Sequence, residues 1–353
     1  MLSLKDREWG TIKLDNLFQI HTGGDLIISR IEKGNIPIIS HSKINNGVAE
    51  YTNHIKGRKL FDSSKSISLA DRGNFCAYVQ KTDFYIGTRV KALVAKFKEA
   101  NREILAFICT LINSQSIRFS YGNNATDYTG KITILIPLIK RNEPDWRFME
   151  NYIKEREQIQ LVEYIAHANK MFAEISDTKI PVQLKEKEWK PFQFNSIFSE
   201  IKRGKRLKKS DHKAGKQPYI SSTATNNGVD GFVSNVDRVR KFKDCLTIAN
   251  SGSVGSTFYH KYEFVASDHV TQLKNVDFNE YIYLFLLPII SRLEEKYSFN
   301  REINDTRINK EVLLLPIDEY GNPDWHYMEQ FAKLIVAEKI KLYLDYSNRK
   351  IGV

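Results

Sequence analysis

A seven-residue string, Pro-Asp-Trp-x-aromatic-Met-Glu, occurs twice in this chain, at Pro144–Glu150 and again at Pro323–Glu329, which begins 179 residues later. Other strings repeat in the same order at nearly the same spacing: Glu8–Phe18 returns as Glu188–Phe198, Asn45–Val48 as Asn226–Val229, and Ile136–Leu138 as Leu315–Ile317. An ordered series with an almost constant offset is the signature of an internal repeat. The 353 residues are therefore predicted to form two copies of one unit.

Each copy is expected to be a mixed α/β unit. A Trp-containing strand and a short helical turn open it, and a Gly-rich basic segment and an apolar strand lead into Asn-Asn-Gly, a tripeptide that tolerates positive φ and predicts a turn. Short alternating apolar segments predict further strands. Arg102–Ile112 and Glu280–Ile290 each predict one buried helix. A strand, a Pro-Asp turn and a long helix complete each copy.

The long helices are predicted to begin at Asp145 and Asp324, because acidic residues are favoured at helix N-termini. Each helix could simply cap its own domain. The alternation of 3- and 4-residue steps between apolar residues instead favours a coiled coil, in which the two helices pair. The residues predicted to pair the helices or to dock a partner are Trp146, Met149, Ile159, Val162, Phe172, Trp325, Met328, Ile335 and Leu342.

The fold class that follows is α+β, a tandem repeat of two mixed α/β domains, each followed by a long helix. The two helices are expected to pack antiparallel as a coiled-coil spacer. The predicted boundaries are 1–143 for the first domain, 144–180 for the first helix, 181–322 for the second domain and 323–353 for the second helix.

The composition bears on the class of binding partner and on the cellular compartment. Lys and Arg outnumber Asp and Glu by 53 to 42, a surplus that suits a polyanionic partner such as DNA or RNA but also an ordinary basic protein. The longest apolar runs, Ile104–Ile112 and Tyr281–Ile290, are too short to span a bilayer. The charged first ten residues predict no secretory signal, and three widely spaced cysteines predict neither disulfides nor a metal site. A reducing cytoplasm is expected.

Signatures of catalysis are scarce. We find no adenine-methyltransferase motif, no phosphate-binding Gly-x-x-x-x-Gly-Lys-Ser/Thr and no His-Glu-x-x-His. Asp145 with Asp177–Lys179 resembles a nuclease metal site only superficially, because a helix of about 30 residues separates the acids and the second copy lacks the same pattern. His41, His54 and His260 are expected as surface or core residues. The prediction is a chain without a catalytic residue, metal or cofactor of its own.

Basic clusters flank both Asn-Asn-Gly turns. Lys202–Lys213 holds seven Lys or Arg residues against one Asp. A single cluster of this kind is usually a solvated charge run, but its repetition at matched places favours phosphate contact, and Asn, Ser and Arg can read base edges. The predicted DNA-binding residues are Lys43, Asn45, Asn46, Lys56, Arg58, Lys59, Arg72, Arg89, Lys202, Arg203, Lys205, Arg206, Lys208, Lys209, Asn226, Asn227, Arg238, Arg240, Lys241, Lys243, Ser251, Ser253, Arg301 and Arg307.

The copies differ between the shared strings. "FCAYVQKT" faces "VGSTFYHK", and "FSYGNNATDYTG" faces "YSFNREINDTR". One scaffold with two different variable surfaces suits recognition of an asymmetric, two-part sequence.

This pattern resembles the specificity subunit of type I restriction–modification systems, and most of all that of type IIB-like systems. The strings that carry the resemblance are "EWKPFQFNSIF", "KRGKRLKKSDHKAGKQPYISSTATNNGVDGFV", "ANSGSVGSTFYHKYEFVASDHV" and "LLLPIDEYGNPDWHYMEQF", with their first-copy counterparts. The likeness covers nearly the whole chain, although the helices are shorter than in typical type I members.

The resemblance implies two target recognition domains that each bind one half of a double-stranded DNA site. It also implies helices that dock methyltransferase subunits or a fused restriction–methylation subunit. Those partners would bind S-adenosylmethionine, and ATP or Mg²⁺ where these are required. A stand-alone nucleic-acid-binding module that acts in regulation or anti-restriction is the alternative, and the bases recognised, the system type and the stoichiometry stay open.

Overall fold

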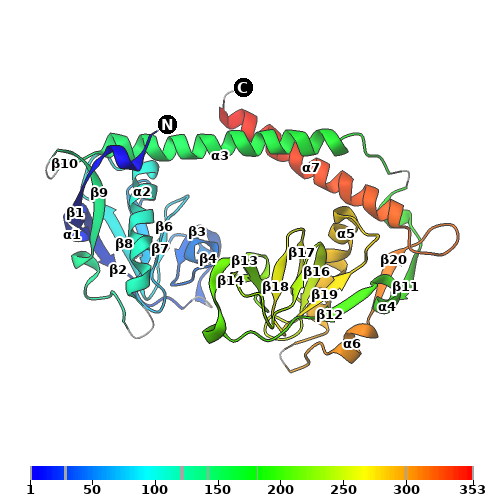
Figure 1. The fold of residues 1–353 in the computed structure, drawn as a ribbon. Coiled ribbons are helices and arrows are strands. Elements are labelled where there is room, and N and C mark those ends of the chain that lie inside the picture. Colours follow the sequence, from blue (N-terminus) through cyan, green and yellow to red (C-terminus); the bar gives the residue numbers. More distant parts are fainter. Residues whose placement is uncertain are drawn as a thin grey trace. The chain divides into compact units, whose positions relative to one another are not determined.

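The computed structural model of the chain describes residues 2–27, 30–119, 123–140, 143–180, 182–298 and 300–351. The chain divides into two compact units, Met1–Tyr164 and Ile165–Val353, in which most elements correspond and follow one another in the same order (Figure 1). The predicted tandem of two mixed α/β units is confirmed.

Unit 1 contains three small sheets. Their strand orders are β1-β9-β10, β2-β8-β5-β6 and β4-β3-β7, and only β3 and β7 run parallel. The elements of the unit are β1 (Glu8–Lys13), α1 (Leu14–Leu17), β2 (Phe18–Thr22), β3 (Lys33–Ile39), β4 (Val48–Thr52), β5 (Ser66–Ala70), β6 (Cys76–Val79), β7 (Tyr85–Ile86), β8 (Val90–Ala95), α2 (Arg102–Asn113), β9 (Thr133–Lys140), β10 (Glu143–Pro144) and α3 (Trp146–Ile175).

Unit 2 repeats this plan with orders β11-β20, β12-β19-β16-β17 and β14-β13-β18-β15. Its elements are β11 (Trp189–Gln193), α4 (Phe194–Ile197), β12 (Glu200–Arg203), β13 (Ala214–Ile220), β14 (Val229–Val233), β15 (Lys241–Phe242), β16 (Cys245–Ala249), β17 (Thr257–His260), β18 (Phe264–Ala266), β19 (Val270–Lys274), α5 (Glu280–Ser291), α6 (Asp305–Asn309), β20 (Val312–Pro316) and α7 (Trp325–Ile351).

Each unit contains one apolar, largely buried helix, as predicted: α2 packs against the sheet β2-β8-β5-β6, and α5 against the sheet β12-β19-β16-β17. The side chains of Asn101 and Asn279 cap α2 and α5 by accepting hydrogen bonds from the backbone N–H groups of Ile104 and Ile282. Below the helices lie two large cores of fully buried residues such as Leu69 and Leu246. Each unit thus buries its own core and presents the loops at the strand ends to solvent.

The long helices start as the sequence predicted. The Asp145 and Asp324 carboxylates accept hydrogen bonds from the third residue beyond them, at 2.9 Å in both copies. Arg7 pairs with Asp145 at 3.1 Å, and Lys187 pairs with Asp324 at 2.7 Å. Burial acts to raise the pKa of Asp324, but the hydrogen bonds from Lys187 and the Tyr327 backbone outweigh it, so that the pKa lies below its ordinary value.

The start of each helix packs on its own domain, which corrects part of the prediction. Met149 and Met328 are fully buried in the cores of units 1 and 2. Trp146 stacks on Phe97 with ring centroids 4.2 Å apart, and Trp325 contacts Phe278 at 4.5 Å. These four residues were expected to pair the helices or dock a partner. They anchor the helices instead, because the first turns lie directly over apolar core residues.

Beyond their first turns, the buried faces of α3 and α7 also differ from the apolar faces that the sequence predicted. Val162, Ile335 and Leu342 are exposed, by 53%, 38% and 62%. The buried residues in these stretches are Ala168, Ile175, Ala337, Leu344 and Ser347. Ile159 and Phe172 are half-buried. Along α7 the covered side turns after Ala332, because the first turns pack on the core while the later turns have left it.

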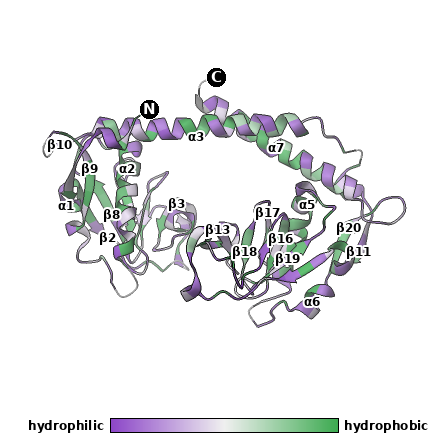
Figure 2. Ribbon diagram, viewed as in Figure 1, coloured by the Kyte–Doolittle hydropathy of each residue, from purple (hydrophilic) through white to green (hydrophobic). Residues whose placement is uncertain are grey.

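Figure 2 shows hydrophilic residues interspersed with hydrophobic ones along the whole length of α3 and α7. Consistent with this, no helix within the described residues is long and apolar enough to cross a membrane. Helix pairing and the four domain boundaries remain predictions. The boundary between the two compact units falls inside α3, after Tyr164.

Candidate nucleic-acid interface

Both Asn-Asn-Gly turns are built alike. Three successive residues have positive φ, with values of 49°, 51° and 82° at Asn45–Gly47 and 51°, 55° and 75° at Asn226–Gly228. Asn and Gly adopt this left-handed conformation at the lowest cost, which explains the repeated tripeptide. The predicted turn is confirmed. The positive φ of these three residues is by itself a sufficient reason for both copies to have Asn-Asn-Gly here.

A polar side chain inside the sheet holds each turn. Gln80 donates to the Asn46 carbonyl at 3.0 Å and to the Ser68 hydroxyl at 2.8 Å. In unit 2, His260 lies 2.8 Å from the Thr247 hydroxyl and 3.5 Å from the Asn227 amide. Burial lowers the pKa of His260 to about 4, so the ring is neutral at physiological pH.

Loops from distant parts of the chain gather at one end of the sheet β2-β8-β5-β6 in unit 1 and of the sheet β12-β19-β16-β17 in unit 2. We name this end the sheet-end site. Its loops are 71–74, 87–89 and 123–125 in unit 1, and 250–253, 267–269 and 303–307 in unit 2. Four backbone N–H···O hydrogen bonds hold these loops in unit 1, and each has a counterpart in unit 2. In unit 1 the donor and acceptor residues are Asp71 and Arg89, Ala125 and Asp71, Gly87 and Ile39, and Gly23 and Val90. In unit 2 they are, in the same order, Asn250 and His269, Ile303 and Asn250, Ser267 and Ile220, and Gly204 and Val270.

Two glycines permit this assembly. A Cβ atom on Gly23 would lie 2.0 Å from the Gly87 carbonyl oxygen, and one on Gly204 would lie 2.1 Å from the Ser267 carbonyl oxygen. The backbone could not approach so closely with any other residue. The glycine in each of the two Gly-rich basic segments therefore fixes where the segment crosses the sheet end.

Different side chains stand on this common backbone. In unit 1, Arg72 and Arg89 are exposed, and Asn74 donates to the His41 carbonyl at 2.8 Å. In unit 2, Ser251 and His269 take the places of the two arginines and are hydrogen-bonded to each other. Scaffold and side chains thus separate into a shared part and a variable part.

Beneath each sheet-end site lies a buried polar pair. In unit 1, Lys91 is 3.5 Å from Asp71 and donates to the Thr22 hydroxyl at 2.9 Å. In unit 2, the matched residues are neutral, and Thr271 donates to the Asn250 side chain at 2.7 Å. The ion pair and the neutral hydrogen bond serve one purpose, because each ties the loop after β5 or β16 to the neighbouring strand.

Apart from Ser251, which is hydrogen-bonded to His269, and three asparagines on the turns, the predicted DNA-binding residues fall into two groups. The first group consists of exposed cations that form no side-chain hydrogen bond or ion pair with any other described residue: Lys43, Lys56, Arg72, Arg89, Lys202, Lys205, Lys208, Lys209, Arg238 and Lys243. These side chains are available to phosphates. Asn45, Asn46 and Asn226 are also exposed, but they lie on the turns rather than at the sheet-end site.

The second group is engaged within the protein. Arg58 donates to the carbonyls of Gly24, Asp25 and Ile86, and burial lowers its pKa, so its guanidinium holds a loop together. The other members and their partners are Lys59 with His21, Arg203 with Asp305, Arg206 with Asp268, Arg240 with the Arg203 carbonyl, Lys241 with Glu263, Arg301 with Tyr297, Arg307 with the Glu302 carbonyl, Asn227 with Tyr259, and Ser253 through its backbone with Ser222.

Several residues of the sheet-end site were missed from sequence. His269, Asp268 and Asn74 were not among the predicted DNA-binding residues, because none of them belongs to a basic cluster or to an Asn-Asn-Gly turn. The repeat itself held the signal: aligning "IGTRV" with "ASDHV" places His269 opposite Arg89. The buried pairs below the loops carry no comparable signal, since strand pairing alone brings them together.

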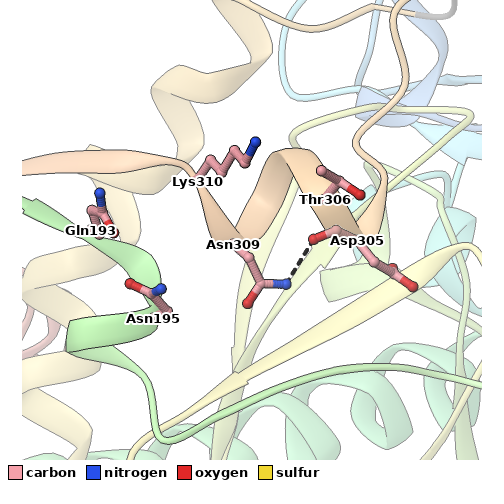
Figure 3. A pocket seen from close by; sticks show the side chains of 6 residues that line it. All are labelled: Gln193, Asn195, Asp305, Thr306, Asn309 and Lys310. Atoms are coloured by element: carbon pink, nitrogen blue, oxygen red, sulfur yellow. Dashed lines mark hydrogen bonds between the residues drawn. The ribbon is translucent and has the colours of Figure 1, made fainter.

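The part of the chain that the structure describes contains no group of three or more His, Cys, Asp or Glu residues able to hold a metal ion. The pocket in Figure 3 lies between Gln193 and Asn195 on one side and α6 on the other, and Asp305 is the one carboxylate among its lining residues. Burial raises the pKa of the Cys109 and Cys245 thiols to about 12, so neither is a thiolate at neutral pH.

Comparison with known proteins agrees with this duplicated, basic architecture. The family model "Type I restriction modification DNA specificity domain" matches residues 6–164 and 186–343. The chain is 30% identical over 330 residues to the "Type II restriction enzyme BgcI specificity subunit S.BcgI" of Heyndrickxia coagulans, which covers 92% of this chain and 93% of that protein.

Two solved structures are also similar. The S subunit of a type I restriction–modification system from M. genitalium aligns over 99% of this chain and 94% of its own, with 17% identity and a TM-score of 0.46. The HsdS subunit from Thermoanaerobacter tengcongensis aligns over 97% and 91%, with 16% identity and a TM-score of 0.33. Because both TM-scores are below 0.5, the assignment rests on the sequence matches. The chain belongs to the family of restriction–modification DNA specificity subunits, and it carries two copies of the family's domain.

Proposed function

We propose that this specificity subunit reads an asymmetric, two-part DNA sequence, one part with each unit, and delivers that sequence to partner subunits that modify or cut it. The observation that carries the proposal is the sheet-end site, which is held by the same backbone hydrogen bonds in both units and carries different side chains. A shared backbone with exchanged side chains is what two readers of different sequences require.

The exposed lysines and arginines supply the sequence-independent part of binding. Lys205, Lys208 and Lys209 lie on the segment that leaves the sheet-end site of unit 2, and all three are exposed. Cations on loops neutralise phosphates and release counterions, which positions a protein on DNA without reading it. Arg58 and Arg240 contribute indirectly, by holding the loops that carry the contacting residues.

The chain itself is proposed to be non-catalytic. Asp145, the best carboxylate of a nuclease-like pattern, caps α3 and pairs with Arg7. S-adenosylmethionine, and ATP or Mg²⁺ where required, would be bound by the partner subunits in the cytoplasm. Metal-dependent cleavage by the purified chain that is lost on Asp145→Ala would contradict this part of the proposal.

The long helices are proposed to pair and to dock a methyltransferase or a fused restriction–methylation subunit. Residues 165–175 of α3 belong to the same compact unit as α7, and both stretches carry buried apolar residues, which supports pairing. Ile335 and Leu342 stay exposed on α7 and would offer an apolar surface to the partner.

The test is methylome sequencing of cells with and without the gene. We expect one bipartite methylated motif to disappear when the gene is deleted, because the modifying subunits then have no reader. An unchanged methylome would overturn the proposal and favour a stand-alone binding module. Complementation with the wild-type gene should restore the same motif.

A further inference from the structure

The sheet-end sites of the two units allow a residue-level assignment, which rests on the proposed function. We propose that Arg72 and Arg89 are the base-reading residues of unit 1, that they recognise guanine, and that Ser251 and His269 at the matched places give unit 2 a different preference. Three observations support this assignment: the positions in the two units are equivalent, the arginine side chains are available, and Arg89 has an unusual backbone conformation.

The positions are equivalent by hydrogen bonding. The Asp71 N–H donates to the Arg89 carbonyl at 3.3 Å, and the Asn250 N–H donates to the His269 carbonyl at 2.8 Å. Arg72 and Ser251 are the next residues after these donors. The loop that diverges most between the copies also docks at the same atom in each, through Ala125 to Asp71 and through Ile303 to Asn250, at 3.0 Å in both cases.

The two arginines are available for an external ligand. Both are exposed, and neither guanidinium forms a hydrogen bond or ion pair with another described residue. Arg58 differs from them, because its guanidinium donates hydrogen bonds to three backbone carbonyls. A guanidinium has a planar fork of donors that matches the O6 and N7 acceptors of guanine, the commonest specific contact in the major groove.

The backbone of Arg89 points to the same role. Its φ is 65°, in the left-handed region, where a long side chain is strained and Gly or Asn is favoured. The matched His269 is not among the described residues with positive φ. Strain held at an exposed arginine is understandable if the side chain is required at that place, since sites of function are where such strain persists.

Unit 2 cannot make the same contact. The Ser251 hydroxyl is hydrogen-bonded to the His269 ring, and Arg206 beside them lies 3.7 Å from the Asp268 carboxylate. In unit 1 the position of Arg206 is taken by Asp25 and that of Asp268 by Thr88, and the Thr88 hydroxyl donates to the Asp25 carboxylate at 2.8 Å. The pair below the loop is likewise ionic in unit 1 and neutral in unit 2. The two readers therefore present different donors and charges to DNA.

The experiment selects preferred sequences from a pool of DNA duplexes with a randomised centre, using the full chain. The wild type is compared with Arg72→Lys/Arg89→Lys, which keeps both charges but removes the two-pronged donors. We expect guanine discrimination in one half-site to fall by roughly 5- to 150-fold per lost contact, corresponding to about 1–3 kcal/mol each. The other half-site, the gap and the salt dependence of binding should be retained.

Lys98→Ala is the matched control, because Lys98 is exposed beyond the opposite end of the same strand, β8. Thermal unfolding of each variant verifies that the fold is kept, and Arg89→Asn, a substitution suited to positive φ, provides a second variant if the lysine pair is unstable. If the folded variants selected the same DNA motif as the wild type, the two arginines would not read bases, and the inference would be overturned. A wild-type chain that selects no bipartite motif would instead overturn the proposed function.

Discussion

Gln80 and His260 occupy matched positions, and each connects a hydroxyl inside the sheet to the neighbouring Asn-Asn-Gly turn. Glutamine has the same hydrogen-bonding capacity at every physiological pH, whereas histidine titrates. The low pKa of His260, about 4 against an ordinary value of 6.5, means that the folded chain excludes the charged ring. The two copies therefore solve one structural problem with different sensitivity to acid.

His260→Gln should remove an acid-sensitive component of stability. A base whose folded pKa is lowered costs stability as pH falls below its unfolded pKa, so the wild type should weaken between pH 6.5 and about 4. The full loss is on the order of 3 kcal/mol from the shift in pKa. Urea denaturation at several pH values measures it. His326→Gln, at an exposed histidine of α7, is the control, and an unchanged pH dependence in His260→Gln would refute the expectation.

Arg238 tests phosphate contact without damage to the fold. Its φ is 60°, and the corresponding position of unit 1 is Gly57, with a φ of 76°. Arg238→Gly relieves strain but adds flexibility to the unfolded chain, so stability should change by less than about 1 kcal/mol. Affinity for all DNA sequences should fall alike, and the slope of log affinity against log salt should flatten by about 0.9. A variant with the wild-type slope would show that Arg238 contacts no phosphate.

At the scale of elements, α7 is divided between two environments. Its first turns bury Met328 and Ala332 in the core of unit 2, whereas the later turns bury Ala337, Leu344 and Ser347. Ile335 and Leu342 each lie two residues before a buried residue, on the opposite side of the helix, and remain exposed. The sequence predicted one apolar face along the whole of α7, but the buried side of the helix changes partway along it. Ile335 and Leu342, which belong to the later part of that predicted face, are therefore candidates for docking a partner rather than for pairing the helices.

Ile335→Glu combined with Leu342→Glu should leave the stability of the isolated chain nearly unchanged, because both side chains are already in contact with water. Assembly with the methyltransferase partner should be lost, since two charges would have to be buried in the interface. Co-purification of the two proteins is the measurement. Lys339→Glu/Lys341→Glu on the same helix controls for added negative charge. Normal assembly of the apolar-to-charged variant would exclude this face as the docking site.

At the scale of the whole molecule, the length of the helices sets the expected spacing of the DNA site. The 30 residues of α3 correspond to about 45 Å at 1.5 Å per residue. If the helices pair antiparallel, as proposed, the units read their half-sites from opposite strands. At about 3.4 Å per base pair, the half-site centres should be roughly 13 base pairs apart. If each unit reads about 3 or 4 base pairs, a gap of about 9 or 10 base pairs remains between the half-sites.

Removing one helical turn from both α3 and α7 should shorten that gap and leave both half-site sequences intact. Replacing residues 20–135 by another recognition domain should do the reverse, changing one half-site and keeping the gap. Methylome sequencing reads both outcomes directly. A continuous recognition sequence without a gap would contradict the spacer model.

Much of the molecule could be predicted from the repeated strings, because they mark positions that the backbone constrains. Asn-Asn-Gly predicted the turn, since three left-handed residues in a row are tolerable only for such residues. Asp145 and Asp324 predicted the helix starts, since a capping carboxylate acts on N–H groups three residues away. Both signals are local, and local interactions can be read along the sequence.

The sequence alone determined the duplication, the order of elements and the surplus of positive charge. Only the tertiary structure decided which cations remain available, because the carbonyls that engage Arg58 come from residues 24, 25 and 86 and meet it through strand pairing. It also decided that His269 lies beside Ser251, to which it is hydrogen-bonded, and that the buried side of α7 changes after Ala332. Contacts between residues far apart in the chain depend on how sheets and helices pack, and no spacing within a segment encodes them.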